Sequence, residues 1–537
     1  MENPFFDISK DIANNFLQNI VFIDDKAFLP EDETNHNFNA LEISKVFANS
    51  QKVCAVYKPE STNDLENIAQ LAKKADITVI DWQINIVEEN TGNEEEDAEE
   101  DDPRGPHTRK IIREILTDPI TGKGSLKLIV IYTGEIGLYD ITNEIFNDLK
   151  DNGIEDVQKG DCQVYTDNIN ILIVAKAANN ENKGEPKFKH APELNEKVVS
   201  YEDLPEFILT EFTKMTSGLL TNFVLNSYTI LRNNTFRLIK LFNKELDPPF
   251  LFHRLLLPIQ DDSKEQLIEI LSHSIQALLN YNKAGESISI SNIFQWLDKF
   301  EFKDSVSVSK KDIILENELL KSLFSNGLQQ TLEELWKNND YGELSKNAVK
   351  SFEKKLHEKG SSFLMDADNS DAQDCAFSIL THHKSDLKQE SLFPVLSLGS
   401  LIKEIDGERY FLCIQAKCDS VRFEIERKFL FLQLDPAEDN SKFQIVVEND
   451  GDFIRLKIKN EAFELRTIKF VPNQDSRTVI AILDAKRYIF ESIYSERFVW
   501  LADLKDAHAQ RVASNYANQL SRVGLDESEW LRRWAEK

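Results

Sequence analysis

The sequence predicts a multidomain chain that begins with an α/β domain built on a parallel sheet, continues with an α-helical middle region and ends in an α+β or mainly β domain. The chain has 537 residues, whereas a single hydrophobic core stops growing at roughly 250 to 300 residues. Residues 1–180 alternate apolar runs with helical patterns, which is typical of a parallel sheet covered by helices. The later part changes first to long helical periodicity and then to short strand patterns.

Five apolar runs mark the strands expected in the first domain. They are continuous and rich in β-branched residues, as strands buried on both faces of a sheet should be. They cover residues 19–25, 52–58, 75–81, 126–133 and 169–176. We expect this domain to span residues 1–180.

An acidic segment at residues 88–106 separates the third and fourth runs. Its like charges repel one another, and its proline and glycine residues disfavour regular structure, so we expect a solvated insertion. A docking segment for a basic partner is the alternative interpretation.

A helical domain is expected over residues 198–361. In its first helices, apolar and amide side chains recur every three or four residues, which predicts one packed helix face. The residues of this face are Ile208, Phe212, Met215, Leu219, Phe223 and Asn226. Packing against the protein's own core is one interpretation, and a homodimer or partner interface is the other. Further helices are expected near 265–284 and 315–337.

A strand-rich domain is expected over residues 374–537, ending in two helices. Gly524 is a suitable residue to end the first of these helices, and Asp526 to begin the second. The helices are expected at 501–524 and 526–537, after strands at 408–421, 428–434, 442–450, 452–460, 466–472 and 487–493.

Composition excludes several classes of protein. No apolar run approaches the roughly 20 residues of a membrane span. The formal charge of −29 opposes nucleic-acid binding, because no basic patch is evident to offset it. The first residues lack the pattern of a secretory signal, and the five cysteines form no disulfide or zinc pattern. We therefore expect a cytoplasmic protein that binds neither nucleic acid nor membrane.

Polar side chains stand at the ends of four of the five apolar runs. Asp24 and Asp25 end the first run, Asp81 the third, Thr133 the fourth and Lys176 the fifth. Because the carboxyl ends of parallel strands meet at one edge of the sheet, we expect these five side chains to converge.

The chemistry of these side chains is complementary. Three clustered carboxylates require a hard cation, and Mg²⁺ binds carboxylate and phosphate oxygens, so Asp24, Asp25 and Asp81 are the expected ligands. A carboxylate can accept a phosphoryl group, and Asp81 is the expected phosphoacceptor. Thr133 and Lys176 can donate to the phosphoryl oxygens, and Lys176 can also pair with Asp81.

Residues 20–176 resemble the receiver domain of two-component response regulators, through the segments IVFIDDKAF, ITVIDWQI, LIVIYTGE and LIVAKA. The resemblance implies a flavodoxin-like sheet of five parallel strands in the order 2-1-3-4-5, a histidine kinase as phosphodonor and Mg²⁺ as cofactor. Two positions depart from the family pattern. Ala177 follows Lys176 where receivers usually have proline, and Ile173 stands where an aromatic residue commonly couples to the threonine.

The later segments resemble the long response-receiver proteins of bacterial defence loci, and the whole chain is similar to the receiver subunits of the Detocs phosphorelay against bacteriophage. That resemblance implies a second receiver protein that bears an effector. No motif of a hydrolase, nucleotidase or zinc enzyme is recognisable here. The expected role is therefore a regulator or phosphate sink that is not an enzyme. The alternative is an effector whose C-terminal domain is activated by phosphorylation, and a DNA-binding output ranks last.

Other polar groups in the later regions are interpreted as ion pairs and interdomain contacts, and two tryptophans as a packing stripe. They are His253 with Arg254, Asp419 with Arg422, Asp506 with His508 and Arg511, and Trp530 with Trp534.

Overall fold

The structure is a computed structural model of the whole chain. It describes residues 4–28, 39–86, 105–118, 126–154, 156–177, 188, 191–302, 304–365, 367–384, 393–437, 442–459 and 464–520. Contacts divide the chain into two compact units, Met1–Phe300 and Glu301–Lys537. The three domain boundaries expected from the sequence stay predictions. The acidic insertion up to residue 104 and the final helix with Trp530 and Trp534 lie outside the described residues.

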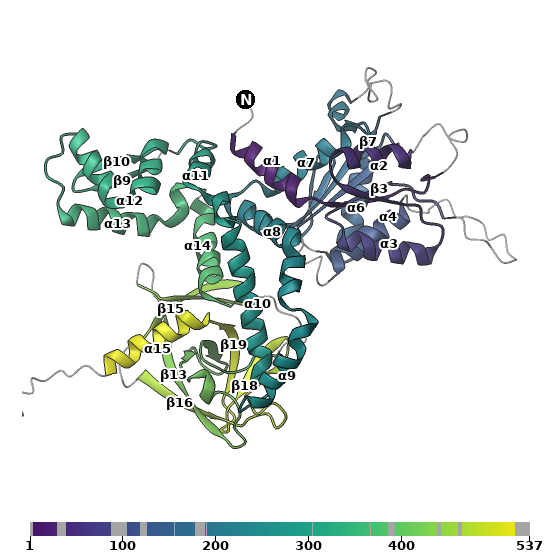
Figure 1. Ribbon diagram of the computed structural model, residues 1–537. Helices are drawn as coiled ribbons and strands as arrows, with labels where there is room; N and C mark the ends of the chain where they lie inside the picture. The colour runs from purple at the N-terminus through teal and green to yellow at the C-terminus, as the bar shows by residue number, and fades with distance from the viewer. Residues whose placement is uncertain are drawn as a thin grey trace, which may run out of the picture. The chain divides into compact units, whose positions relative to one another are not determined.

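The first unit contains the expected parallel sheet (Figure 1). The five long parallel strands of the sheet lie in the order β2-β1-β3-β4-β7, which confirms the order 2-1-3-4-5. Their bounds are β1 Asn19–Ile23, β2 Val53–Tyr57, β3 Ile77–Ile80, β4 Lys127–Thr133 and β7 Ile169–Lys176.

The sheet has eight strands, so the prediction of a five-stranded sheet is wrong in number. A hairpin of β5 (Gln158–Gly160) and β6 (Gln163–Tyr165) adds antiparallel strands beyond β7. The short strand β8 (Val198–Val199) pairs in parallel with the end of β7. These strands have two or three residues each and form no apolar run, so the sequence pattern does not reveal them.

Helices cover both faces of the sheet. On β1, Val21 and Ile23 point to one apolar cluster, and Ile20 and Phe22 point to the other, because side chains alternate along a strand. The first cluster includes residues of α3, α4 and α6, and the second includes residues of α1, α2 and α7. The bounds are α1 Pro4–Phe16, α2 Ala40–Asn49, α3 Thr62–Lys74, α4 Pro106–Thr117, α6 Leu138–Asp151 and α7 Leu204–Thr216.

The helical region after the sheet begins with α7 and α8 (Leu219–Leu241). Ile208 and Phe212 of α7 are buried in the core of the sheet, so the interpretation of core packing is confirmed for this helix. The start of α8 packs on α1, where Asn222 Nδ2 donates a hydrogen bond of 3.0 Å to Ser9 Oγ.

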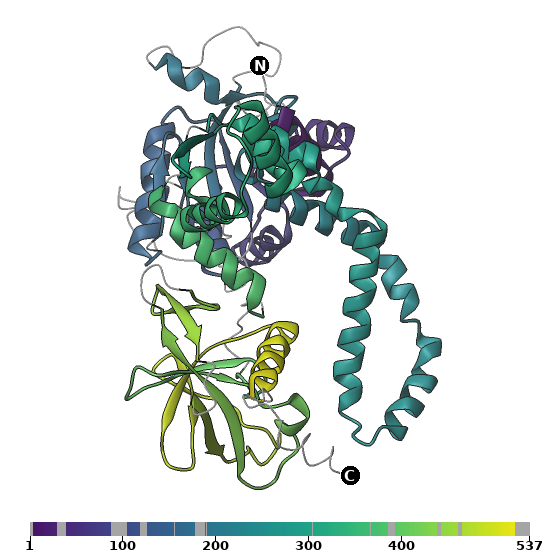
Figure 2. The same ribbon diagram turned by 90° about the vertical axis from the view of Figure 1, so that its left-hand side faces the viewer.

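Beyond this contact, residues 230–281 form a helical projection that we call the arm. It comprises the second half of α8, then α9 (Asp247–Leu256) and α10 (Asp262–Tyr281), and it is the teal hairpin in Figure 2. The chain returns to α1 and α8 through α11 (Ile290–Leu297). Across the described residues, no helix combines the length and apolar character that a membrane crossing requires.

The second unit begins with a β-hairpin, β9 (Asp304–Val308) and β10 (Lys311–Leu315), inside the region expected to be helical. Alternate residues of both strands are buried, as a period of two requires. The hairpin packs with α12 (Asn317–Asn338) and α13 (Lys346–Lys359). The purely helical interpretation of residues 198–361 is therefore wrong at this hairpin.

The remainder of the second unit is a nine-stranded antiparallel sheet with α14 (Ala367–His382) and α15 (Asp506–Leu520). All six expected strands are present, and three further strands were not expected. The expected helix at 501–524 begins only at Asp506, because residues 501–503 complete β19. The strands are β11 Ser400–Glu404, β12 Tyr410–Cys413, β13 Arg427–Pro436, β14 Ile445–Asn449, β15 Asp452–Ile458, β16 Leu465–Phe470, β17 Ile482–Asp484, β18 Arg487–Glu491 and β19 Arg497–Asp503.

Candidate functional site

The polar residues at the strand ends lie at one edge of the first sheet. Asp24 and Asp25 follow β1, Asp81 follows β3, and Thr133 and Lys176 are the last residues of β4 and β7. Ile23 pairs with Ile80, and Thr133 pairs with Ala175. The register therefore aligns the carboxyl ends of the four strands, as expected from the sequence.

Lys176 joins two of the carboxylates directly. Its Nζ donates hydrogen bonds of 2.6 Å to Asp81 Oδ1 and 2.7 Å to Asp24 Oδ2. The side chains of Asp24 and Asp81 are 0% and 8% exposed, and that of Lys176 is 15% exposed. A buried ion pair of this kind is costly to form unless both charges are well paired, so its presence at a strand edge favours a functional role.

Asp25 has a carboxylate oxygen that lacks a partner. Its Oδ2 accepts hydrogen bonds of 3.0 Å from the backbone N–H of Asn85 and 3.1 Å from the Asn85 side-chain amide. Its Oδ1 is buried and has no hydrogen-bond partner among the described residues. A buried oxygen of this kind requires an explanation, and a cation is one of the ordinary ones.

Thr133 is buried at the same edge. Its hydroxyl oxygen accepts a hydrogen bond of 3.1 Å from the backbone N–H of Glu135. Among the described contacts none joins this hydroxyl to Asp81. The structure therefore places Thr133 at the same edge as the carboxylates, and its hydrogen bond to a phosphoryl oxygen stays a prediction.

The charges of the site shift the pKa values of its groups. Burial raises the pKa of Asp81 to about 6, against the attraction of Lys176 and with the help of the negative charges of Asp24 and Asp25. Burial by itself would lower the pKa of Lys176, but the adjacent carboxylates of Asp81 and Asp24 raise it above its ordinary value. Lys176 is therefore a firmly charged ammonium group at neutral pH.

The charge of this donor set suits a magnesium ion. With all groups ionised, the three carboxylates and one ammonium leave two uncompensated negative charges, which a divalent cation would balance. Within the described residues, no group of three or more His, Cys, Asp or Glu side chains is arranged around a common metal position. At this site Lys176 lies between Asp24 and Asp81 and uses one oxygen of each.

The backbone of Asp81 is held by the start of α4. Thr108 Oγ1 makes hydrogen bonds to the carbonyl oxygens of Asp81 at 2.8 Å and Trp82 at 3.0 Å. Gly105, with φ of 66°, lies against the buried Trp82 ring, and a Cβ at Gly105 would approach that ring to 2.7 Å. Sequence reasoning missed these residues, and the Gly-Pro start of α4 after the acidic segment is the signal that could have revealed them.

Tyr132 is another residue of the site that sequence reasoning missed. Its buried ring lies below the ammonium group of Lys176, whose Nζ is 5.7 Å from the ring centroid. Its hydroxyl donates a hydrogen bond of 2.8 Å to the carbonyl oxygen of Val199 in β8. Ile173, where an aromatic residue commonly stands, is fully buried. An aromatic residue directly before Thr133 was the available signal.

Comparison with known proteins identifies the first part of the chain. A family model described as a response receiver domain matches residues 16–181. Residues 16–181 form a response receiver domain. No curated protein and no solved structure matches the chain.

A response receiver domain implies phosphoacceptor activity of the response-regulator type and suggests a histidine kinase as partner. Receiver domains generally bind Mg²⁺ at the phosphorylation site, in agreement with the buried carboxylates described above.

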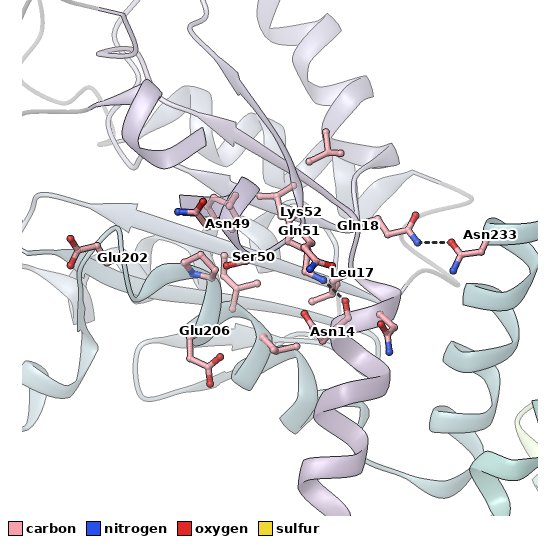
Figure 3. A pocket seen from close by; sticks show the side chains of 17 residues that line it. Asn14, Leu17, Gln18, Asn49, Ser50, Gln51, Lys52, Glu202, Glu206 and Asn233 are labelled. Carbon is pink, nitrogen blue, oxygen red and sulfur yellow. Dashed lines mark hydrogen bonds between the residues drawn. The ribbon is translucent and has the colours of Figure 1, made fainter. Parts of the chain in front are cut away.

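A cavity of about 770 Å³ lies elsewhere in the first unit (Figure 3). Its lining includes Gln18, directly before β1, and Lys52 and Val53, at the start of β2. Polar side chains dominate the close-up, where Gln18 Nε2 donates to Asn233 Oδ1 at 3.4 Å. The cavity is thus at the amino ends of the strands, whereas the carboxylates are at the carboxyl ends, so it is no part of the receiver site.

The other polar groups singled out in the sequence make contacts within their own units. Arg254 Nη2 pairs with Asp261 at 3.4 Å, which agrees with the ion-pair interpretation. Asp506 pairs with Lys384 and Lys417. Further contacts join His253 to Gln266, the carbonyl oxygen of Asp419 to Arg427, and His508 to Arg511.

Proposed function

We propose that this protein accepts a phosphoryl group from a histidine kinase on Asp81. The observation that carries the proposal is the buried bridge in which Lys176 Nζ lies 2.6 Å from Asp81 Oδ1 and 2.7 Å from Asp24 Oδ2. This bridge places a fixed positive charge beside the one carboxylate that follows the central strand β3.

The transfer proceeds by attack of a carboxylate oxygen of Asp81 on the phosphorus of phosphohistidine. The new P–O bond replaces the P–N bond, whose electron pair stays on the imidazole nitrogen of the kinase. The ammonium of Lys176 offsets negative charge on the phosphoryl oxygens, and the hydroxyl of Thr133 donates to one of them. Asp24, Asp25 and Asp81 would hold Mg²⁺, which supplies further positive charge to these oxygens when it is bound.

The test uses the full chain and a purified cognate kinase, with a gel that separates phosphorylated from unmodified protein. Asp81→Asn should abolish labelling, because an amide oxygen does not form a stable acyl phosphate by this attack. Asp167→Asn, a change at an exposed carboxylate of the same domain, is the matched control and should be labelled as wild type. Equal labelling of Asp81→Asn would contradict the proposal.

The wider role we propose is that of a cytoplasmic regulator or phosphate sink in a phosphorelay against bacteriophage, with a second, effector-bearing receiver as partner. The support is the resemblance of the later segments to long response-receiver proteins of defence loci. In this role the chain performs only its own phosphorylation and a slow hydrolysis of the acyl phosphate. Cells that carry the kinase and the effector receiver should show more phosphorylated effector receiver when this chain bears Asp81→Asn. Unchanged effector phosphorylation would argue against a sink.

A second candidate function is an effector whose C-terminal part acts after phosphorylation. The hydrogen bond from Tyr132 to Val199 favours it, because it links the strand of Thr133 to the segment that leads into α7. Metabolite profiles of cells expressing the phosphorylated wild type and Asp81→Asn distinguish the two roles. A sink leaves the profiles equal, whereas an effector changes them only in the wild type.

A further inference from the structure

The arm, residues 230–281, buries almost none of its side chains. The structure describes every residue of this range, and Ser263 alone is buried. In contrast, the first half of α8, which packs on α1, buries Asn222, Leu225, Ser227 and Thr229. Helices of this length are stabilised mainly by packing of an apolar face, so the arm lacks the contacts that ordinarily stabilise such helices.

The exposed surface of the arm is strongly apolar. Leu256 is 68% exposed and Ile268 67% exposed. The other large apolar side chains that are half or more exposed are Phe236, Ile239, Leu241, Leu251, Phe252, Leu255, Ile270 and Tyr281. Since a large aromatic side chain has about 150 to 250 Å² to bury, the whole set leaves on the order of 1,000 Å² uncovered.

The exposed apolar area of the arm can be compared with that of monomer surfaces and of protein–protein interfaces. The largest apolar patch of an ordinary monomer is about 300 to 600 Å². A stable protein–protein interface takes about 800 Å² from each partner. The summed area on the three helices of the arm exceeds the first value and reaches the second, so an interface that covers most of these side chains has the area that a stable dimer needs.

The arm carries a basic group and an acidic group at separate places along its length. Arg237 and Lys240 lie near the end of α8, and Glu265 and Glu269 lie near the start of α10. These four residues form no ion pair among the described residues. In a two-fold pair that sets α8 of one copy beside α10 of the other, the basic group of each copy would meet the acidic group of its partner.

We infer that the arm is a dimerisation surface that binds the arm of a second copy of this chain. The two arms form a helical bundle in which the exposed apolar side chains of α8, α9 and α10 become the core. The occupant is a copy of the same chain, because one surface supplies both the apolar area and the complementary charges.

The dimer does not depend on phosphorylation of Asp81. The base of the arm is tied to the amino ends of the strands, where Arg232 Nη2 pairs with Asp76 Oδ1 at 2.7 Å directly before β3. Asp81 lies at the opposite end of β3. Failure of the dimer and failure of phosphorylation are therefore separate outcomes.

Sedimentation equilibrium of the full chain measures the dimer. Wild type and Asp81→Asn should both sediment as dimers. Phe252→Glu with Leu255→Glu should raise the dissociation constant at least about 100-fold, because two charges would enter the bundle core. Ile482→Glu, at a half-exposed apolar side chain of the second unit, is the matched control and should leave the dimer intact. A wild-type monomer, or a dimer that survives the double substitution, would overturn the inference.

A charge exchange tests the proposed pairing of α8 with α10. Arg237→Glu with Lys240→Glu should weaken the dimer at least about tenfold by placing like charges together. Adding Glu265→Lys with Glu269→Lys to the same chain should restore it. Phosphorylation of Asp81 in every variant verifies that the receiver domain is folded. A dimer that the first pair leaves unchanged, or the second pair fails to restore, would overturn this arrangement.

Discussion

The hydroxyl of Tyr132 donates a hydrogen bond of 2.8 Å to the carbonyl oxygen of Val199. This bond connects β4, which ends in Thr133, to β8, which precedes α7. Tyr201 lies beside the same ring, with ring centroids 5.9 Å apart. The receiver site is thus joined to the first helix of the next region through one buried phenol.

Tyr132→Phe should weaken this connection without removing the phosphoacceptor. The change removes one of two donors to the carbonyl oxygen of Val199, which keeps its hydrogen bond of 3.2 Å from the backbone N–H of Ala177. The loss should therefore be about 0.5 to 1.5 kcal/mol of the free energy of unfolding. Urea denaturation measures the loss, and hydrogen exchange should show faster opening in β8 and the start of α7. Tyr139→Phe, at a partly exposed tyrosine of α6, is the control. Equal exchange in both variants would exclude a structural role for the Tyr132 hydroxyl.

Lys176→Met should raise the pKa of Asp81 above its value of about 6. Lys176 opposes the effects of burial and of the neighbouring carboxylates on Asp81, both by its charge and by its hydrogen bond. Without it the carboxylate becomes harder to ionise. A carbon-13 NMR titration of the aspartate carboxyl groups measures the change, with the exposed Lys45→Met as control. A pKa of Asp81 that stays the same or falls would contradict the described ion pair.

Stability without Mg²⁺ should decrease as the pH rises from about 4 to 6. The pKa of Asp81 in the folded chain, about 6, lies above its ordinary value of 3.8, so the protonated carboxyl favours folding at low pH. That contribution is lost as the pH rises through 6, where the buried group must ionise. Asp81→Asn should therefore be more stable than wild type at pH 7, by on the order of 3 kcal/mol.

Urea denaturation at pH 4 and pH 7, with a chelator present, measures this difference. The free energies of unfolding of wild type and Asp81→Asn should become similar at pH 4, where Asp81 is protonated. A variant that is less stable than wild type at pH 7 would show that the ion pair with Lys176 outweighs the cost of burying the charge.

Five residues of the receiver site were predictable from the sequence because they stand at the ends of four apolar runs. Predicting that Asp81 belongs to the site required only the rule that parallel strands align their carboxyl ends at one edge of the sheet. The side-chain hydrogen bonds across the sheet were not predictable in this way. That Lys176 bonds to both Asp24 and Asp81 depends on side-chain geometry that no spacing encodes.

The elements that the sequence analysis did not predict lack a recognisable pattern for identifiable physical reasons. Strand β8 has only two residues, of which Val199 pairs with Lys176. A strand of this length shows no periodic pattern in the sequence. In the hairpin of β9 and β10, buried and exposed side chains alternate over only five residues per strand, inside a long helical region. Its four buried aliphatic side chains therefore form only a short strand pattern. The helices of the arm were partly expected, but their exposure could not be, because an apolar helix face is identical in sequence whether the protein's own core or a partner covers it.

Magnesium should stabilise the wild-type protein through Asp25. Oδ1 of Asp25 is buried and has no hydrogen-bond partner among the described residues, while Asp24 and Asp81 already share the charge of Lys176. A cation bound there would satisfy this oxygen and offset the remaining negative charge. Thermal unfolding with increasing Mg²⁺ should therefore raise the melting temperature of the wild type.

Asp25→Asn separates this effect from general salt stabilisation. It removes one negative charge from the site, so binding of Mg²⁺ should weaken at least about tenfold, a change of about 1.4 kcal/mol. Asp167→Asn changes the net charge of the chain equally at an exposed position and should respond to Mg²⁺ as the wild type does. If both variants respond alike, Asp25 does not hold the cation, and its unpaired buried oxygen lowers the stability of the fold without a metal to offset it.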